Sequence, residues 1–345
     1  MRPKQLEFVY MRGIAIMLIV AGHSVYNSGQ GFPQLLENLI RGGTALFVFI
    51  SGYFFHRVFY SRFEFRRFMQ SKINNVLWPF LIISLIGLLA LTPQWLLVEH
   101  HSLQQLPTDF WYTVRNGYVL YPHWYIPFIL AMFLLSPLFM DYIKLSARWR
   151  WGVLLGLSVI AIAVQRPIGN VNVLQSVLYF TPFYLLGMCY SQDDERLAAL
   201  KLPLRWGAWA VLALALVMQT YVNNHLGNYH KAMFELGGMD WQFVQKLALC
   251  VLVLQGCEWL AQGKERPWLM RLAEMSFAIF FLHPLLSIAI ANASHFAHFK
   301  LAAGSALTSI GYSCLLFTVQ LWGSVLIALG LKQCFGERSK TVMGW

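Results

Sequence analysis

An arginine and a histidine lie eleven positions apart in the first apolar stretch of the chain, at Arg12 and His23. At about 100° per residue the two side chains share one helical face, roughly 16 Å apart along the axis. Imidazole titrates near neutral pH and suits proton transfer, whereas a fixed cation suits anion binding. Ionisable side chains within an apolar helix normally face an interior cavity. The pair therefore marks a candidate catalytic groove, although Arg12 alone is typical of a membrane anchor and His23 alone of a packing residue.

The element that must position this pair is a membrane helix. The chain has 345 residues, of which 58% are hydrophobic and only 12% charged, which indicates an all-α polytopic membrane protein. Its net charge of +11 does not indicate a nucleic-acid partner, because the cations are dispersed between apolar stretches. We predict a single membrane domain over residues 1–345 with no appended soluble domain. About ten spans are expected, near 8–27, 41–58, 74–97, 124–143, 151–167, 171–190, 206–223, 242–262, 268–293 and 303–331.

The distribution of Lys and Arg tests this topology. With the N-terminus in the cytoplasm, the predicted inner segments hold 19 of the 26 Lys and Arg residues. Cytoplasmic loops of membrane proteins carry such an excess of cations. We therefore predict that both termini lie in the cytoplasm, with Arg12 on the cytoplasmic side of His23.

The segment between the second and third predicted spans combines cations with aromatic residues. Read as a helix at the cytoplasmic surface, it either binds anionic lipids or holds a phosphate-bearing ligand, because guanidinium groups match phosphate oxygens. Its candidate ligand-binding cations are Arg62, Arg66, Arg67 and Lys72.

Other candidates lie in the second, fourth and ninth predicted spans. Arg41 is expected near the outer boundary, as an anchor or as a contact to a polar acceptor. Trp124 and Tyr125 fit an interfacial aromatic belt or a surface on which a sugar stacks. His283 precedes a proline, which indicates a helix kink, or else a residue that orients the substrate or His23. Ser51 and Tyr53 follow the small residues of the second span and complete the candidate set.

Five motifs, in order, resemble the acyltransferase-3 family of integral membrane acyltransferases. The resemblance covers about residues 5 to 290, and its first two motifs are specific in combination. The motifs are Arg-Gly-Ile-Ala-Ile-x5-Gly-His-Ser from Arg12, Phe-x-Phe-Ile-Ser-Gly-Tyr-Phe from Phe47, the basic segment before Leu77-Trp78-Pro79, His123 to Pro127, and Met275 to Pro284.

The resemblance implies transfer of an acyl group, most often acetyl, from a cytosolic acyl-CoA to a hydroxyl of a cell-surface glycan or its lipid-linked precursor. In the family, the functional pair is an arginine and a histidine separated by ten residues, here Arg12 and His23. Many relatives show two arginines separated by two residues in the basic segment. This chain departs from that pattern, with Arg62 four positions before Arg66 and Arg67 adjacent to it.

From these observations we predict an acyl-CoA-dependent O-acyltransferase in the bacterial cytoplasmic membrane, with His23 as general base. Arg12 is expected to bind the donor or stabilise developing negative charge. An acyl-His23 intermediate stays open, as do a homo-oligomer and contacts with other proteins of glycan synthesis. The five cysteines show no metal-ligand spacing, so no metal is expected. The alternative is a transporter or flippase of a glycan or lipid intermediate, although no internal repeat supports it.

Overall fold

The computed structural model describes residues 5–298 and 304–345. Within them, nine helical segments are long and apolar enough to cross a membrane, and a bent helix pair supplies a tenth. Apart from one two-residue strand pair, the regular structure of these residues is helical. The prediction of an all-α polytopic membrane protein with about ten spans is confirmed.

The first half of the chain is built from nine α-helices with short π- and 3-10-helical segments between them. These are α1 (Leu6–His23), α2 (Gln34–Ile40), α3 (Gly43–Phe54), η1 (Phe55–Phe59), η2 (Tyr60–Arg62), α4 (Phe65–Lys72), η3 (Ile73–Leu77), α5 (Trp78–Pro93), η4 (Gln94–Val98), α6 (Leu106–Val114), η5 (Tyr121–Trp124), α7 (Tyr125–Leu134), α8 (Ser136–Lys144) and α9 (Ala147–Val164).

The second half carries the strand pair and the longest helices. Its elements are β1 (Arg166–Pro167), η6 (Ile168–Asn170), α10 (Val173–Gln192), α11 (Asp194–Ala199), α12 (Lys201–Val217), η7 (Met218–Val222), β2 (His230–Lys231), α13 (Trp241–Ala261), α14 (Pro267–Glu274), α15 (Ser276–Phe296), α16 (Ala306–Phe335), η8 (Gly336–Arg338) and α17 (Ser339–Met343).

Three predicted spans have a different internal structure. The span near 124–143 is bent by 55° between α7 and α8, where a proline stands in the first turn of α8. The span near 268–293 is divided at Met275 into α14 and the longer α15. The second span extends back to Gln34 because α2 precedes α3 with only a short break.

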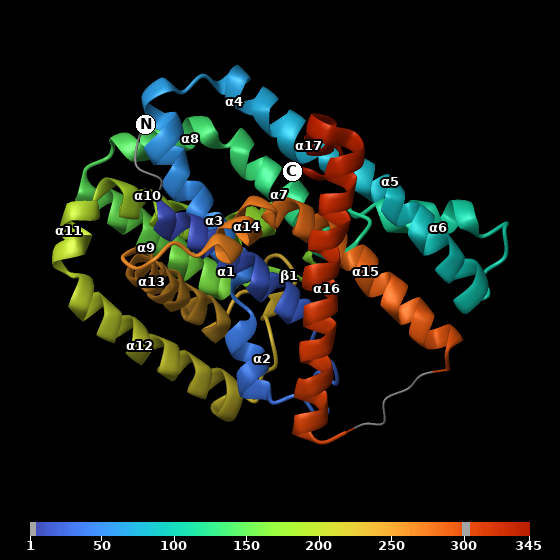
Figure 1. Ribbon diagram of the computed structural model, residues 1–345. Coiled ribbons are helices and arrows are strands. Elements are labelled where there is room, and N and C mark those ends of the chain that lie inside the picture. The colour runs from blue at the N-terminus through green and yellow to red at the C-terminus, as the bar shows by residue number, and fades with distance from the viewer. Residues whose placement is uncertain (1–4, 299–303) are drawn as a thin grey trace.

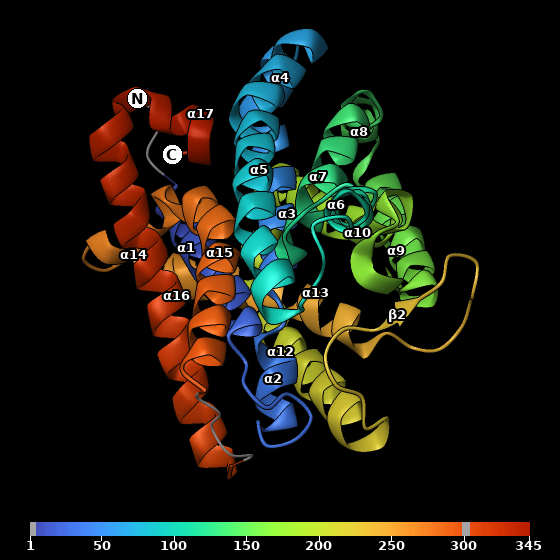
Figure 2. The same cartoon turned by 90° about the vertical axis from the view of Figure 1, so that its right-hand side faces the viewer.

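The bundle has two distinct ends. In Figures 1 and 2, α4, α8 and α17 lie at the upper end, whereas α2 lies toward the lower end. The basic segment around α4 thus lies at the opposite end from the loops that follow α1 and α9. This arrangement agrees with the side assignment made from Lys and Arg, although the orientation in a membrane stays a prediction.

Glycines bring the central helices into close contact. A Cβ at Gly43 of α3 would stand 2.5 Å from the carbonyl oxygen of Ala15 in α1. Where α3 meets α10, a Cβ at Gly52 would overlap the backbone of Tyr184, and one at Gly187 would overlap the backbone of Phe49. The small residues of the second span therefore let its backbone approach α1 and α10, as is common between membrane helices. This packing holds α1, which carries Arg12 and His23, inside the bundle.

Candidate functional site

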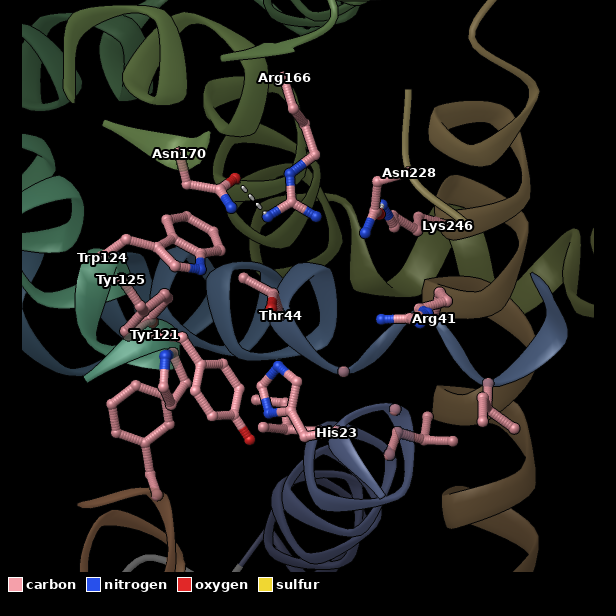
Figure 3. A pocket seen from close by; sticks show the side chains of 18 of the residues that line it. His23, Arg41, Thr44, Tyr121, Trp124, Tyr125, Arg166, Asn170, Asn228 and Lys246 are labelled. Atoms are coloured by element: carbon pink, nitrogen blue, oxygen red, sulfur yellow. Dashed lines mark hydrogen bonds between the residues drawn. The ribbon is translucent and has the colours of Figure 1, made fainter. Parts of the chain in front are cut away.

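A cavity of about 350 Å³ lies beside the C-terminal end of α1. His23 projects into it from α1, together with side chains from the segments before α3 and α7, from the β1 region and from α13 (Figure 3). Most of its polar groups come from loops and helix ends rather than from the middle of spans. The cavity thus lies toward the end of the bundle opposite α4.

Two histidines form the centre of the site. The Nδ1 atom of His23 lies 3.1 Å from the Nε2 atom of His283, and the rings are stacked with an interplanar angle of 6°. His283 is fully buried, and its Nδ1 atom lies 2.9 Å from the carbonyl oxygen of Ile279, one turn earlier in α15. Tyr121 contacts His23 edge-to-face, at 4.8 Å between ring centroids.

This chain of contacts assigns the tautomers of both neutral rings. A carbonyl oxygen only accepts hydrogen bonds, so Nδ1 of His283 carries the proton and its Nε2 atom is an acceptor. The Nδ1 atom of His23 must then donate to that acceptor. The Nε2 atom of His23 is left with a free lone pair, which is the form of imidazole that accepts a proton.

Arg12 lies deeper in the bundle, toward the α4 end. Its Nε atom donates to the Oγ atom of Ser276 at 2.6 Å, and its guanidinium lies 5.9 Å from the centroid of the Phe277 ring. The side chain is half-buried. Arg12 and His23 do share one side of α1, because both contact α15: Arg12 its first turn and His23 its third.

An apolar gap separates Arg12 from the cavity. It has a volume of about 20 Å³, and Ser276 and Phe277, the contacts of Arg12, line it on one side. Ile19, Tyr125 and Phe280 line both this gap and the cavity of His23. The gap therefore lies between the contacts of Arg12 and the cavity of His23.

Three cations also line the cavity, and each has a different partner. Arg41 forms an ion pair with the buried Glu37 at 2.5 Å. Lys246 donates to the Oδ1 atom of Asn228 at 2.6 Å. Arg166 donates to the Oδ1 atom of Asn170 at 2.8 Å, as Figure 3 shows.

The aromatic wall of the cavity is formed by Trp124 and its neighbours. The guanidinium of Arg166 lies over Trp124, 4.8 Å from the ring centroid, and Trp124 itself stacks on Phe180. Tyr125 is buried and has Ser51 and Arg12 among its polar neighbours. Trp124 and Tyr125, predicted to belong to an interfacial aromatic belt or to a sugar-stacking surface, thus lie on the wall of the cavity.

The strand pair holds Arg166 beside His230. Arg166 and His230 are paired in the parallel register of β1 and β2, and the Nδ1 atom of His230 lies 2.7 Å from the carbonyl oxygen of Pro167. Burial, reinforced by the nearby Arg166, lowers the pKa of His230 to about 4, so that ring is neutral at neutral pH. Burial also lowers the pKa of Arg166, to about 10, which leaves its guanidinium charged.

The predicted donor-binding cations lie apart from the cavity. Arg62, Arg66 and Arg67 are exposed at the α4 end. Lys72 is instead turned inward, with its Nζ atom between 4.7 and 4.9 Å from the ring centroids of Phe59, Phe68 and Phe133.

The two remaining candidates of the second span are also separated from His23. Tyr53 accepts a hydrogen bond from Gln5 and lines a different cavity at the α4 end. Ser51 donates to the carbonyl oxygen of Phe47 within α3. Among the candidates, the structure thus brings together His23, His283, Arg41, Trp124 and Tyr125, with Arg12 on the far side of the apolar gap.

Sequence reasoning missed four cavity-lining residues that contact His23 or carry a cation or an imidazole. They lie in the short connections that precede α7, α10 and α13 or within α13, where neither a motif nor a helical period marks them. One signal was present, because Arg166 and Lys246 are two of only six cations that the topology leaves on the sparsely charged outer side. The missed residues are Tyr121, Arg166, His230 and Lys246.

The fold and the cavity define a multi-pass integral membrane protein with a histidine pair at an internal cavity. No group of three or more His, Cys, Asp or Glu side chains that could hold a metal occurs in the described part of the chain. A family model described as an acyltransferase domain, Acyl_transf_3, matches residues 6–329, nearly the whole chain. The protein therefore belongs to the acyltransferase-3 family and is a membrane acyltransferase. Neither a curated protein nor a solved structure shows a significant match to it.

Proposed function

We propose that the protein moves an acyl group, most simply acetyl, from a cytosolic acyl-CoA to a sugar hydroxyl of a cell-surface glycan or its lipid-linked precursor. The proposed location is the bacterial cytoplasmic membrane. Membership of the acyltransferase-3 family supports the acyl transfer itself. The donor, the acceptor and the membrane are inferences from the features described below.

The observation that carries the proposal is the contact between His23 and His283. It leaves the Nε2 atom of His23 as a proton acceptor at the wall of a cavity large enough for a sugar. A neutral imidazole with a free ring nitrogen can take the proton of a hydroxyl as that hydroxyl attacks. His283 is a positioning residue here, because it acts on the substrate only through His23.

In the proposed step, the Nε2 atom of His23 takes the proton of the acceptor hydroxyl while the hydroxyl oxygen attacks the thioester carbonyl. A new carbon–oxygen ester bond forms and the carbon–sulfur bond breaks. The imidazolium of His23 then returns its proton to the departing thiolate. Throughout, the Nδ1 proton of His23 stays hydrogen-bonded to His283, which keeps the ring in place.

Arg12 is proposed to hold the donor on its way to His23. Its contacts Ser276 and Phe277 line the apolar gap, and Ile19, Tyr125 and Phe280 line both the gap and the cavity. A phosphate group is costly to desolvate among apolar side chains, so the acyl-bearing arm is the part of the donor proposed to reach His23. The phosphate-bearing head of the donor is thus expected at the α4 end.

The test uses the full-length protein in lipid nanodiscs with radiolabelled acetyl-CoA. The acceptor probe is a glycolipid fraction from the envelope of bacteria that lack this protein. We expect label in the glycan with the wild type and none with His23→Ala. His295→Gln, a change at an exposed histidine of α15, serves as the matched control. Equal labelling by wild type and His23→Ala would overturn the assignment.

A further inference from the structure

The cavity beside His23 carries one more buried positive charge than its nearby carboxylates neutralise. Arg41 is paired with Glu37, whereas Lys246 and Arg166 share one buried acidic neighbour, Asp240. Within the described residues, no carboxylate forms an ion pair with Arg166. Its contacts are an amide oxygen and two aromatic rings.

Arg166 is also strongly desolvated for a cation with so few partners. It is 6% exposed, and its Nε atom is buried without a hydrogen-bond partner in the described structure. A buried charge is normally paired, because an unpaired one costs several kcal/mol. Figure 3 shows its guanidinium pointing into the open part of the cavity, on the same side as Arg41 and Lys246 and facing His23.

The backbone around Arg166 is built to hold it there. Gln165 has a φ of 58° and a ψ of −172°, a conformation that non-glycine residues rarely adopt. The amide of Gln175 secures this turn by donating to the carbonyl oxygens of Gln165 and Lys231. The backbone N–H of Arg166 donates to the carbonyl oxygen of Tyr229, which ties it to the β2 segment. Local strain held by several contacts is typical of functional sites rather than of simple anchors.

We propose that this cavity binds an acceptor sugar that bears an oxyanion, a carboxylate or a phosphate, close to the hydroxyl that is acylated. This inference rests on the proposed function, since it names the substrate class of the same site. Arg166 is the main anion ligand, with the free N–H groups of Arg41 beside it. His230, whose Nδ1 atom is occupied by Pro167, presents its Nε2 atom as an acceptor for a sugar hydroxyl.

The anion belongs to the acceptor rather than to the donor because of where the cavity lies. The phosphate groups of an acyl-CoA are expected at the α4 end, and only an apolar gap of about 20 Å³ lies between the contacts of Arg12 and the cavity. Arg166 lies beyond that gap, at the end of α9 distant from α4. Trp124 beneath Arg166 adds an aromatic face of the kind on which sugars stack.

Binding without the donor tests this proposal directly. The full-length protein is placed in nanodiscs of uncharged phosphatidylcholine, and calorimetry measures the affinity of three probes. Methyl glucuronoside carries a carboxylate, a glucosyl phosphate carries a phosphate, and methyl glucoside is neutral. We expect one or both anionic probes to bind at least about 10-fold more tightly than methyl glucoside, since a charged hydrogen bond in a buried site has this effect. The anionic probe that binds more tightly shows whether the oxyanion of the acceptor is a carboxylate or a phosphate.

Variants separate the anion site from general damage. Arg166→Gln should abolish the preference for the anionic probe, and Arg166→Lys should retain part of it. Arg115→Gln is the matched control, because Arg115 is an exposed arginine in a loop and does not line the cavity. Equal affinity for all three probes, or a preference that survives Arg166→Gln, would overturn the proposal. If the proposed function itself is wrong, acyl transfer will not depend on His23. That result comes from the acyl-transfer assay and is separate from the binding of the probes.

Discussion

The two ends of the bundle both gather cations, but they hold them in opposite ways. At the α4 end, Arg62, Arg66 and Arg67 are exposed on short helical segments. At the other end, Arg166 and Lys246 are almost fully buried, and each donates to a neighbouring asparagine. The cations therefore form an exposed surface at the α4 end and a buried site with fixed partners at the other end.

This difference determines which ligands each end of the bundle can recognise. Exposed charges are screened by salt over about 10 Å and bind any polyanion weakly. Buried charges in fixed positions act in a medium of lower polarity, so they are stronger and select by geometry. Substitutions in the His23 cavity should thus cost far more than substitutions of the exposed arginines, and the predictions below test that order.

The largest effect is expected for His23 itself. Replacing it with alanine removes the proton acceptor, so turnover should fall by about 10²- to 10⁴-fold, the usual contribution of general acid–base catalysis. Radiolabelled acyl transfer by the purified protein measures this loss, with thermal unfolding as a check that the variant is folded. A turnover within a few fold of the wild type would remove His23 from the chemistry.

The next largest effect is expected at His283, where two variants differ in one property. Phenylalanine is similar in size to histidine but accepts no hydrogen bond, whereas the side-chain oxygen of glutamine accepts one from the Nδ1 proton of His23. His283→Phe should lower kcat by about 10²-fold, because it removes the acceptor that keeps the proton of His23 on Nδ1. His283→Gln should lower kcat by clearly less, because it retains an acceptor for that proton. If both variants lose the same activity, His283 has a packing role rather than a positioning role.

The sequence predicted the fold better than it predicted the site. Apolar length and the positions of Lys and Arg are local properties, and they were enough to place about ten spans. The bend between α7 and α8 was missed because Pro137 lies within a largely apolar stretch. The division at Met275 was missed because the predicted span ran across Arg271 and Glu274, whose charges mark it. The helix geometry of α1 likewise predicted correctly that Arg12 and His23 lie along one side.

The contacts of that pair could not be obtained in the same way. His23 meets His283 across 260 positions of sequence, and Arg166 meets His230 through a strand pair of two residues. Such contacts depend on how distant helices pack, which no local period encodes. The surroundings of Lys72 could not be predicted either: its type and spacing indicated a phosphate ligand, and the structure places its ammonium group beside three aromatic rings.

A smaller effect is expected at Arg12, which lies between the two ends. Arg12→Ala should raise the KM for acetyl-CoA by about 10-fold, because it removes one half-buried charged contact to the donor. Arg12→Lys keeps the charge but not the fork geometry, and should recover part of the loss. Initial rates at varied acetyl-CoA and fixed acceptor measure both. A change in the KM of the acceptor alone would instead place Arg12 on the acceptor side.

The smallest effect is expected at the exposed arginines of the α4 end. Replacing Arg62, Arg66 and Arg67 together with glutamine should raise the KM for acetyl-CoA only about two- to five-fold, because each exposed charge contributes no more than about 1 kcal/mol and is screened. The rise should shrink as salt increases, since the Debye length falls from about 10 Å at 0.1 M to 3 Å at 1 M.

Arg148→Gln, at an exposed arginine at the start of α9 on the same end, is the control for a general loss of surface charge. A KM that the triple variant leaves unchanged at low salt would make the basic segment a lipid anchor only. A loss as large as that of His23→Ala would mean that the exposed end is as preorganised as the buried one, and would remove the difference between the two ends.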